Sequence, residues 1–220
     1  MKREINRKNY TENRDKYILK ICKNKKVLHI GACDAPYTKI KEKQKSLLYL
    51  KISKVCKEQL GIDLDKKSIE YLNNKKLKNS KIKYVNMNNL EKINFKPEVI
   101  VFGETIEHLM NLQTALENIK KIMTEDTLLL VSTPNSNFIF RILEGIRGKV
   151  TEHEDHNVLF NYKTLEQLFR KTKFKVLDKK FTFLDNNDSS TLSIFRMFLA
   201  KSISKLFPIY AGTLLFIVKK

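Results

Sequence analysis

Short apolar runs alternate with amphipathic stretches along most of the chain. The first run, residues 27–30, is long enough for one buried strand and too short for a helix, and Gly31 follows it directly. Later runs bounded by glycine, proline or polar residues predict further strands. These strands are expected over 61–65, 81–87, 97–103 and 127–132.

The stretches between these runs carry apolar residues at helical spacing. They predict helices over 10–22, 47–60 and 112–123, and one that begins after Asp65, a good N-cap. Residues 37–45 are too charged to assign. Because strands alternate with helices and the strands are almost continuously apolar, we expect a parallel sheet covered on both faces.

The last third has a different pattern. Residues 174–183 alternate apolar side chains with lysine, which is typical of a strand near the edge of a sheet. The remaining segments predict a helix over 164–171 capped by Thr164, a polar loop over 185–190, an amphipathic helix over 192–207 and a final strand over 213–218.

Two roles are open for the amphipathic helix. The favoured one is packing on the sheet between the last two strands. In the other, Phe195, Phe198, Met197 and Phe207 border a substrate entrance, and nearby lysines contact an anionic membrane surface.

Composition fits one globular domain. The chain has 220 residues, of which 42% are hydrophobic and 30% are charged. Three cysteines without paired spacing argue for a reducing compartment and against a disulfide framework or a zinc site. The N-terminus shows no signal peptide, and no apolar run reaches the roughly 18–20 residues of a membrane span. We therefore expect a cytoplasmic protein.

The net charge of +19 raises the expectation of an anionic partner only modestly. Lysine dominates the basic residues and is spread through nearly every segment, as codon bias in an AT-rich genome would produce. Arginine, which reads phosphates and bases in a bidentate way, is sparse. Nucleic acid is thus a partner that the sequence allows but does not favour.

The glycines and one acid suggest a nucleoside site. Gly31, Gly61 and Gly103 fall at strand borders, and Asp63 lies at the end of the second strand. A carboxylate there can accept both hydroxyls of a ribose, whereas the alternative role of helix cap suits Asp65 better. On its own, Gly31 is equally compatible with an ordinary tight turn.

The order of these motifs resembles the class I S-adenosylmethionine-dependent methyltransferases, in particular a methyltransferase type 11/23-like subgroup, over nearly the whole chain. The likeness is carried by residues 27–33, 61–63, 99–109, 128–135 and 152–156, followed by Phe160, Thr164 and Leu165. Many members of the subgroup methylate small molecules, lipids or surface-glycan precursors, so O-methylation of such an acceptor is the implied function.

The resemblance implies one α/β domain over 1–220, doubly wound around a mostly parallel seven-stranded sheet in the order 3-2-1-4-5-7-6. The last strand is antiparallel, and helices lie on both faces. An N-terminal arm and helix would occupy 1–22, and a loop and amphipathic helix would occupy 185–207 before the last strand. Oligomeric state does not follow from the likeness.

The resemblance also assigns cofactor-binding residues. Gly31, Ala32 and Cys33 would contact the methionine moiety of S-adenosylmethionine, and Asp63 would contact its ribose. Asn86 and Met87 would contact the adenine, and Gly103 is a further cofactor-binding residue. Two residues depart from the family pattern: His29 replaces an acid, and Asn86 replaces an aspartate. Either would weaken cofactor binding, so an inactive copy is an alternative.

A second group of residues follows the fourth strand. Glu104, Glu107 and His108 come directly after it, and His153 and His156 lie in a later segment. Carboxylates with imidazoles can bind a divalent cation or supply a general base for a hydroxyl nucleophile. We expect His156, Glu104 and His108 to be catalytic, without a metal. The alternative is that Glu107 and His108 only orient local backbone.

The same group resembles the small-RNA 3′-terminal ribose 2′-O-methyltransferases, which use such residues to hold a metal. The basic charge favours this second function, but the later segment lacks the aromatic and arginine residues expected around an RNA end. A non-catalytic nucleotide- or nucleic-acid-binding module is a third possibility, in which Glu104 and His156 would be incidental.

Overall fold

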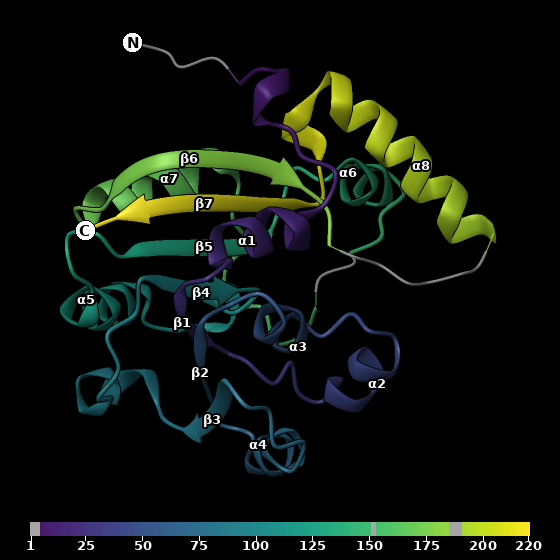
Figure 1. The fold of residues 1–220 in the computed structure, drawn as a ribbon. Coiled ribbons are helices and arrows are strands. Elements are labelled where there is room, and N and C mark those ends of the chain that lie inside the picture. The colour runs from purple at the N-terminus through teal and green to yellow at the C-terminus, as the bar shows by residue number, and fades with distance from the viewer. Residues whose placement is uncertain (1–4, 151–152, 185–190) are drawn as a thin grey trace.

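The computed structural model describes residues 5–150, 153–184 and 191–220 and arranges them around one twisted sheet (Figure 1). Seven strands of this described chain pair in the order β3-β2-β1-β4-β5-β7-β6. Their bounds are β1 Lys26–Ile30, β2 Glu58–Asp63, β3 Ser80–Tyr84, β4 Val99–Gly103, β5 Leu128–Pro134, β6 Lys175–Thr182 and β7 Thr213–Lys219. Strands β1 to β5 pair in parallel, and β7 runs antiparallel to both β5 and β6. The predicted α/β fold, strand order and antiparallel last strand are confirmed.

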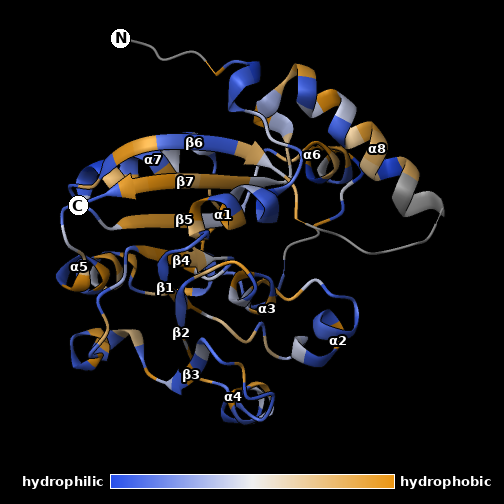
Figure 2. Cartoon of the chain, viewed as in Figure 1, coloured by the Kyte–Doolittle hydropathy of each residue, from blue (hydrophilic) through white to orange (hydrophobic). Residues whose placement is uncertain are grey.

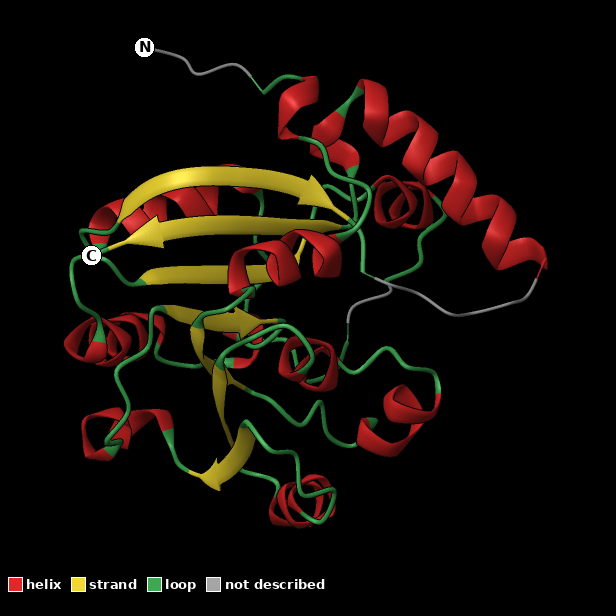
Figure 3. Ribbon diagram, in the orientation of Figure 1, coloured by secondary structure: helices red, strands yellow, loops and turns green. Residues whose placement is uncertain are grey.

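Helices lie on both faces of the sheet (Figure 3). The α-helices are α1 Arg14–Cys22, α2 Thr38–Lys43, α3 Leu48–Ser53, α4 Lys66–Asn73, α5 Leu112–Ile122, α6 Ile139–Ile146, α7 Tyr162–Lys171 and α8 Thr191–Leu206. Short 3-10 helices are η1 Arg7–Asn9, η2 Met87–Lys92, η3 Ile106–His108 and η4 Pro208–Tyr210. None of the described helices is long and apolar enough to cross a bilayer.

Alternate residues of the central strands point to opposite faces of the sheet. On β4, Val99 and Val101 join the apolar cluster that includes α1 and α3, whereas Ile100 and Phe102 join the larger cluster that includes α5 and α7. All four side chains are at most 1% exposed. Both faces are thus filled, which accounts for the apolar stretches that Figure 2 shows along the central strands.

The largest error of the sequence prediction concerns the segment before β2. The helix predicted over 47–60 is wrong in its second half, because α3 ends at Ser53 and β2 already begins at Glu58. Gly61 therefore lies within a strand. A Cβ at this position would come within 2.9 Å of the Ala32 Cβ and 3.0 Å of the Tyr49 ring, so close packing requires the glycine.

Other boundaries differ at helix starts and strand ends. Helix α7 is capped by Asn161 and not by Thr164; the Asn161 side chain accepts hydrogen bonds from two backbone N–H groups, and the Thr164 hydroxyl accepts one in return from the Asn161 N–H. The third strand ends at Tyr84, before the predicted limit of 87, and η2 follows. Helices α2 and α6 were not predicted. The loop predicted over 185–190, part of the N-terminal arm (1–4) and Glu152 lie outside the described residues.

Candidate active site

The carboxyl ends of β1, β2 and β4 meet at one edge of the sheet, where ligands of open α/β sheets bind. Two cavities open there, with volumes of about 530 Å³ and about 370 Å³. Both are lined by Gly31, Asp63 and Thr105, so the two cavities adjoin at these residues. Together they offer an extended binding site, in which the larger part is lined by several charged side chains and the smaller part is mainly apolar.

The Gly31 turn needs a glycine for two reasons. Its φ of +70° lies in the left-handed region, which L side chains rarely adopt. A Cβ would also lie 2.5 Å from the Thr105 hydroxyl oxygen, on the wall shared by the cavities. Thr105 is itself held by a 2.9 Å hydrogen bond from its hydroxyl to the Gly103 carbonyl. The turn therefore brings backbone, without a side chain, to the point where the cavities meet.

Asp63 is held by three backbone donors. One carboxylate oxygen accepts from the Cys33 N–H at 2.8 Å, and the other accepts from the N–H groups of Leu64 at 2.7 Å and Asp65 at 3.0 Å. A carboxylate has about four acceptor positions, so one remains for a ligand. Asp65 caps α4 by accepting from the Ser68 N–H, as predicted. Asp63 is thus a fixed acceptor facing both cavities.

The structure groups most of the predicted cofactor residues around these cavities. Asn86 and Met87 line the smaller one among apolar neighbours, and Gly103 lines the larger one. The side chains of Ala32 and Cys33 line neither, because they are buried in a cluster with Tyr49. Any contact from these two to a cofactor is therefore limited to backbone atoms.

The two departures from the family pattern differ in their surroundings: Asn86 caps a helix, whereas His29 is buried at the larger cavity and its Nδ1 atom has no hydrogen-bond partner in the described chain. The Asn86 side chain accepts a hydrogen bond from the Asn88 N–H at 2.9 Å and so caps η2. His29 is only 3% exposed, and burial lowers its pKa to about 4, so its imidazole is neutral at pH 7. Neither residue blocks a cavity.

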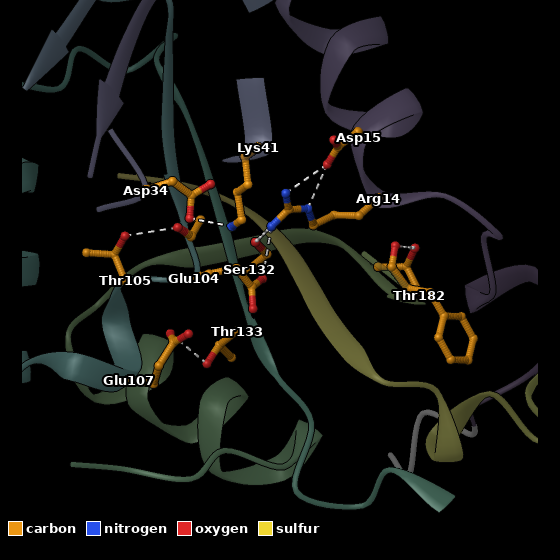
Figure 4. A network of polar contacts seen from close by, with 12 residues as sticks. Arg14, Asp15, Asp34, Lys41, Glu104, Thr105, Glu107, Ser132, Thr133 and Thr182 are labelled. Carbon is orange, nitrogen blue, oxygen red and sulfur yellow. Dashed lines mark hydrogen bonds and ion pairs between the residues drawn. The ribbon is translucent and has the colours of Figure 1, made fainter. Parts of the chain in front are cut away.

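A buried ionic network, which sequence reasoning missed, lies beside the larger cavity (Figure 4). Arg14 at the start of α1 donates two hydrogen bonds to Asp15, at 2.9 Å and 2.8 Å, and one to Glu104 at 3.1 Å. Its Nη1 also lies 3.4 Å from the Ser132 hydroxyl. Lys51 of α3 reaches the other oxygen of Asp15 at 2.7 Å. The network ties two helices to the end of β4.

The charges in this network compensate one another. Burial works to lower the pKa of Arg14, but the carboxylates of Asp15 and Glu104 raise it above its ordinary value. Burial works to raise the pKa of Asp15, but Arg14 and Lys51 bring it below its ordinary value. For Glu104 burial prevails and the pKa is raised, although Arg14 opposes the shift. The cation thus stabilises two carboxylates in a place with little water.

Glu107 forms the floor of a second group of side chains. It is 1% exposed and accepts a 3.0 Å hydrogen bond from the Thr133 hydroxyl. Burial and then the charge of Glu104 raise the pKa of Glu107 to about 8. Its backbone carbonyl accepts from the N–H groups of Asn157 and Val158, at 2.9 Å and 3.2 Å. These bonds fix the loop that carries His156.

Three histidines, His108, His153 and His156, lie close to one another, and two of them are near Glu107. The His108 ring lies 4.9 Å from the His156 ring and 6.2 Å from the His153 ring, measured between centroids. The Nδ1 atom of His156 is buried without a hydrogen-bond partner in the described chain. Burial, and then the neighbouring histidines, lower the pKa of His156, which keeps its imidazole neutral and able to accept a proton.

The structure therefore brings together two of the three residues predicted to be catalytic. His108 and His156 are neighbours, whereas Glu104 faces Arg14 on another wall of the same cavity. Ligand atoms of Glu107, His108 and His156 all lie within 4.8 Å of one another, a spacing that could hold a metal ion.

Comparison with known proteins supplies the family. A family model described as a methyltransferase domain matches residues 3–179. The chain is a member of this methyltransferase family. It is thus an enzyme, and S-adenosylmethionine is its cofactor. A search of curated proteins found no match.

Solved structures share the fold of this methyltransferase at low sequence identity. A SAM-dependent methyltransferase from Archaeoglobus fulgidus is 17% identical with a TM-score of 0.58, covering 93% of this chain and 90% of that chain. The N-methyltransferase NodS from Bradyrhizobium japonicum WM9 is 13% identical with a TM-score of 0.53, covering 94% of each. The [4+2]-cyclase SpnF is 9% identical with a TM-score of 0.58, covering 94% and 81%. The fold alone therefore does not decide the acceptor.

The two cavities fit the cofactor. The smaller one offers apolar walls with Asn86 at its edge, which suits a purine ring. The free acceptor capacity of Asp63, where the cavities meet, suits ribose hydroxyls. The larger one, with its charged walls, suits an amino acid moiety.

Proposed function

We propose that this methyltransferase acts on a hydroxyl group of a small molecule, a lipid or a surface-glycan precursor, with His156 as the general base. One observation carries the proposal: the Nδ1 atom of His156 is buried, lacks a partner in the described chain and belongs to a residue that lines the larger cavity. A neutral imidazole in such a place accepts the proton that a hydroxyl must lose.

The surrounding residues would position the reactants. S-adenosylmethionine supplies an electrophilic methyl group when bound. Gly31 and Asp63 would hold its nucleoside side, while Glu107 holds the loop of His156 through its backbone carbonyl. The transfer is an in-line displacement, so alignment of the acceptor hydroxyl by the cavity walls lowers the barrier along with proton removal.

The test compares His156→Gln with the unmodified enzyme. Labelled S-adenosylmethionine is offered with separate fractions of hydroxylated small molecules, lipids, glycans and RNA, and turnover is measured on whichever fraction accepts the methyl group. Turnover should fall by about 10²–10⁴-fold, while calorimetric affinity for the cofactor stays unchanged. An unchanged rate with the accepted fraction would exclude His156 as the base.

The grouping of Glu107, His108 and His156 favours one second function, a metal-dependent RNA 3′-terminal ribose 2′-O-methyltransferase. Against it, Glu104 is engaged by Arg14 and is not among the grouped ligand atoms. Calorimetric titration of the cofactor-free protein with Mg²⁺ or Mn²⁺ separates the two functions. Binding that Glu107→Gln removes, with activity that chelators abolish, would favour the metal-dependent enzyme.

For the compartment we propose the cytoplasm. The support is that all three cysteines are unpaired and buried, as is usual where disulfides do not form.

A further inference from the structure

Helix α8 buries one side and leaves large apolar side chains exposed on another. Ala200 and Ser204 are fully buried on the side toward the protein. On the outward side, Phe195, Phe198 and Leu199 are 64%, 70% and 41% exposed. The spacing of three and four residues puts the outward side chains on one face of the helix. The buried side of α8 packs mainly against η4, so the predicted packing of this helix on the sheet between the last two strands is not confirmed.

The exposed apolar surface extends to α6. Arg196 joins the two helices, because its guanidinium donates to Glu144 at 2.9 Å and lies 4.7 Å from the centre of the Phe140 ring. On α6, Ile142 and Ile146 are 38% and 77% exposed. The exposed apolar residues of α6, α8 and the position after it form an outer face that consists of Ile142, Leu143, Ile146, Phe195, Phe198, Leu199, Leu206 and Phe207. Exposed apolar side chains gathered on two neighbouring helices mark an interaction site.

The positive charge around the outer face favours an anionic binding partner. Residues 139–150 and 195–207 contain six basic side chains and a single acidic one, Glu144, which is paired with Arg196. Arg147, Lys149 and Lys205 are exposed. A second copy of the chain would bring the same cations together, in a molecule whose net charge is already +19.

The shape of the outer face suits a bilayer. Figure 1 shows α8 along the outer margin of the molecule, and Figure 2 shows hydrophobic turns along both helices. A projecting helix with Phe and Leu outward and Lys and Arg beside them matches helices that lie in a membrane interface. We propose that the outer face docks this protein on an anionic membrane surface.

Docking uses residues outside both cavities, so it is tested without cofactor or acceptor and stands or falls apart from the proposed function.

Flotation of the full chain with lipid vesicles tests the proposal. The probes are vesicles of phosphatidylcholine alone and vesicles in which about a third of the lipid is phosphatidylglycerol. We expect flotation only with the second at about 0.1 M salt, and its loss at about 1 M salt, where the Debye length falls from about 10 Å to about 3 Å. Equal flotation, or none, with both vesicle types would overturn the proposal.

Two variants and their controls locate the surface. Lys201→Gln with Lys205→Gln should weaken vesicle binding by about 25-fold, since each basic residue near an anionic surface contributes roughly a factor of five. Phe195→Ser with Phe198→Ser should weaken it by about 100-fold or more. The controls are Lys163→Gln with Lys171→Gln on α7, and Ile40→Ser on α2, all exposed positions elsewhere.

The controls should float like the unmodified protein. Equal loss in control and outer-face variants would overturn the assignment of this surface, as would a concentration-dependent dimer that Phe195→Ser with Phe198→Ser dissolves. Circular dichroism and cofactor affinity, measured for every variant, show that the fold is intact.

Discussion

The cofactor edge of the sheet buries charged side chains, whereas the outer face of α6 and α8 exposes apolar ones. At the cofactor edge, charged groups such as Arg14 and Asp15 are at most 7% exposed, and each has partners at hydrogen-bond distance. On the outer face, large apolar groups such as Phe198 are 70% exposed. In the first region these buried charges are compensated by contacts within the chain. The second exposes large apolar side chains that no other part of the described chain covers, so we expect another molecule to bind there.

The largest effect should come from breaking the buried network. Arg14→Met removes the guanidinium between Asp15 and Glu104, so that a buried carboxylate loses its compensating charge. We expect the free energy of unfolding to fall by about 3–5 kcal/mol. Urea denaturation measures it, with the exposed Arg7→Met as the control within about 0.5 kcal/mol. A loss below about 1 kcal/mol would show that the cofactor edge is not held by this network.

Burial of His29 should make the same region sensitive to acid. The pKa is about 4 in the folded protein and about 6.5 when unfolded, so between these values the unfolded state binds more protons. Stability contributed by the neutral imidazole is therefore fully present above pH 6.5 and is lost as the pH falls toward 4, by about 3 kcal/mol in total. His29→Gln should remove this part of the slope in urea denaturation between pH 7 and pH 4.5. An identical slope in the variant would contradict it.

The sequence predicted those parts of the fold that local pattern decides. Strands β4 and β5 are continuous apolar runs with clear ends, and Asp65 is an N-cap by local chemistry alone. The start of β2 could not be found in this way, because Glu58 and Gln59 are polar and become a strand only through pairing with β1. Helix α6 was missed as well, because it has only eight residues and no side chain caps its start.

For the site, the sequence revealed residues at strand ends but not long-range pairs. Gly31 and Asp63 follow from their positions after β1 and β2. Arg14 contacts Glu104 across ninety residues of sequence, and no local pattern links them. The only signal was the rarity of arginine and its place beside Asp15 at the start of a helix. That Glu104 and His156 lie on different walls of the cavity could likewise be seen only in the folded structure.

A smaller effect should separate cofactor binding from stability at this edge. Asp63→Ala removes the acceptor facing both cavities, and loss of a charge-assisted hydrogen bond costs about 1.5–3 kcal/mol, or roughly 10–100-fold in affinity. Calorimetry with S-adenosylmethionine and its demethylated product measures it. Asp65→Ala is the matched control. It removes a helix cap worth about 1 kcal/mol of stability, but Asp65 does not line the larger cavity. Equal affinities in both variants would refute the ribose role of Asp63.

The smallest effect should come from the outer face. Phe198→Ala removes a side chain that is 70% exposed, so no cavity opens and the free energy of unfolding should change by less than about 0.5 kcal/mol. Phe169→Ala on α7 is the matched substitution in the core, where the side chain is fully buried and the expected cost is about 3–5 kcal/mol. Urea denaturation of the two variants measures both. A cost above about 1.5 kcal/mol for Phe198→Ala would mean that the protein itself covers this face in solution, and the contrast between the two regions would fail.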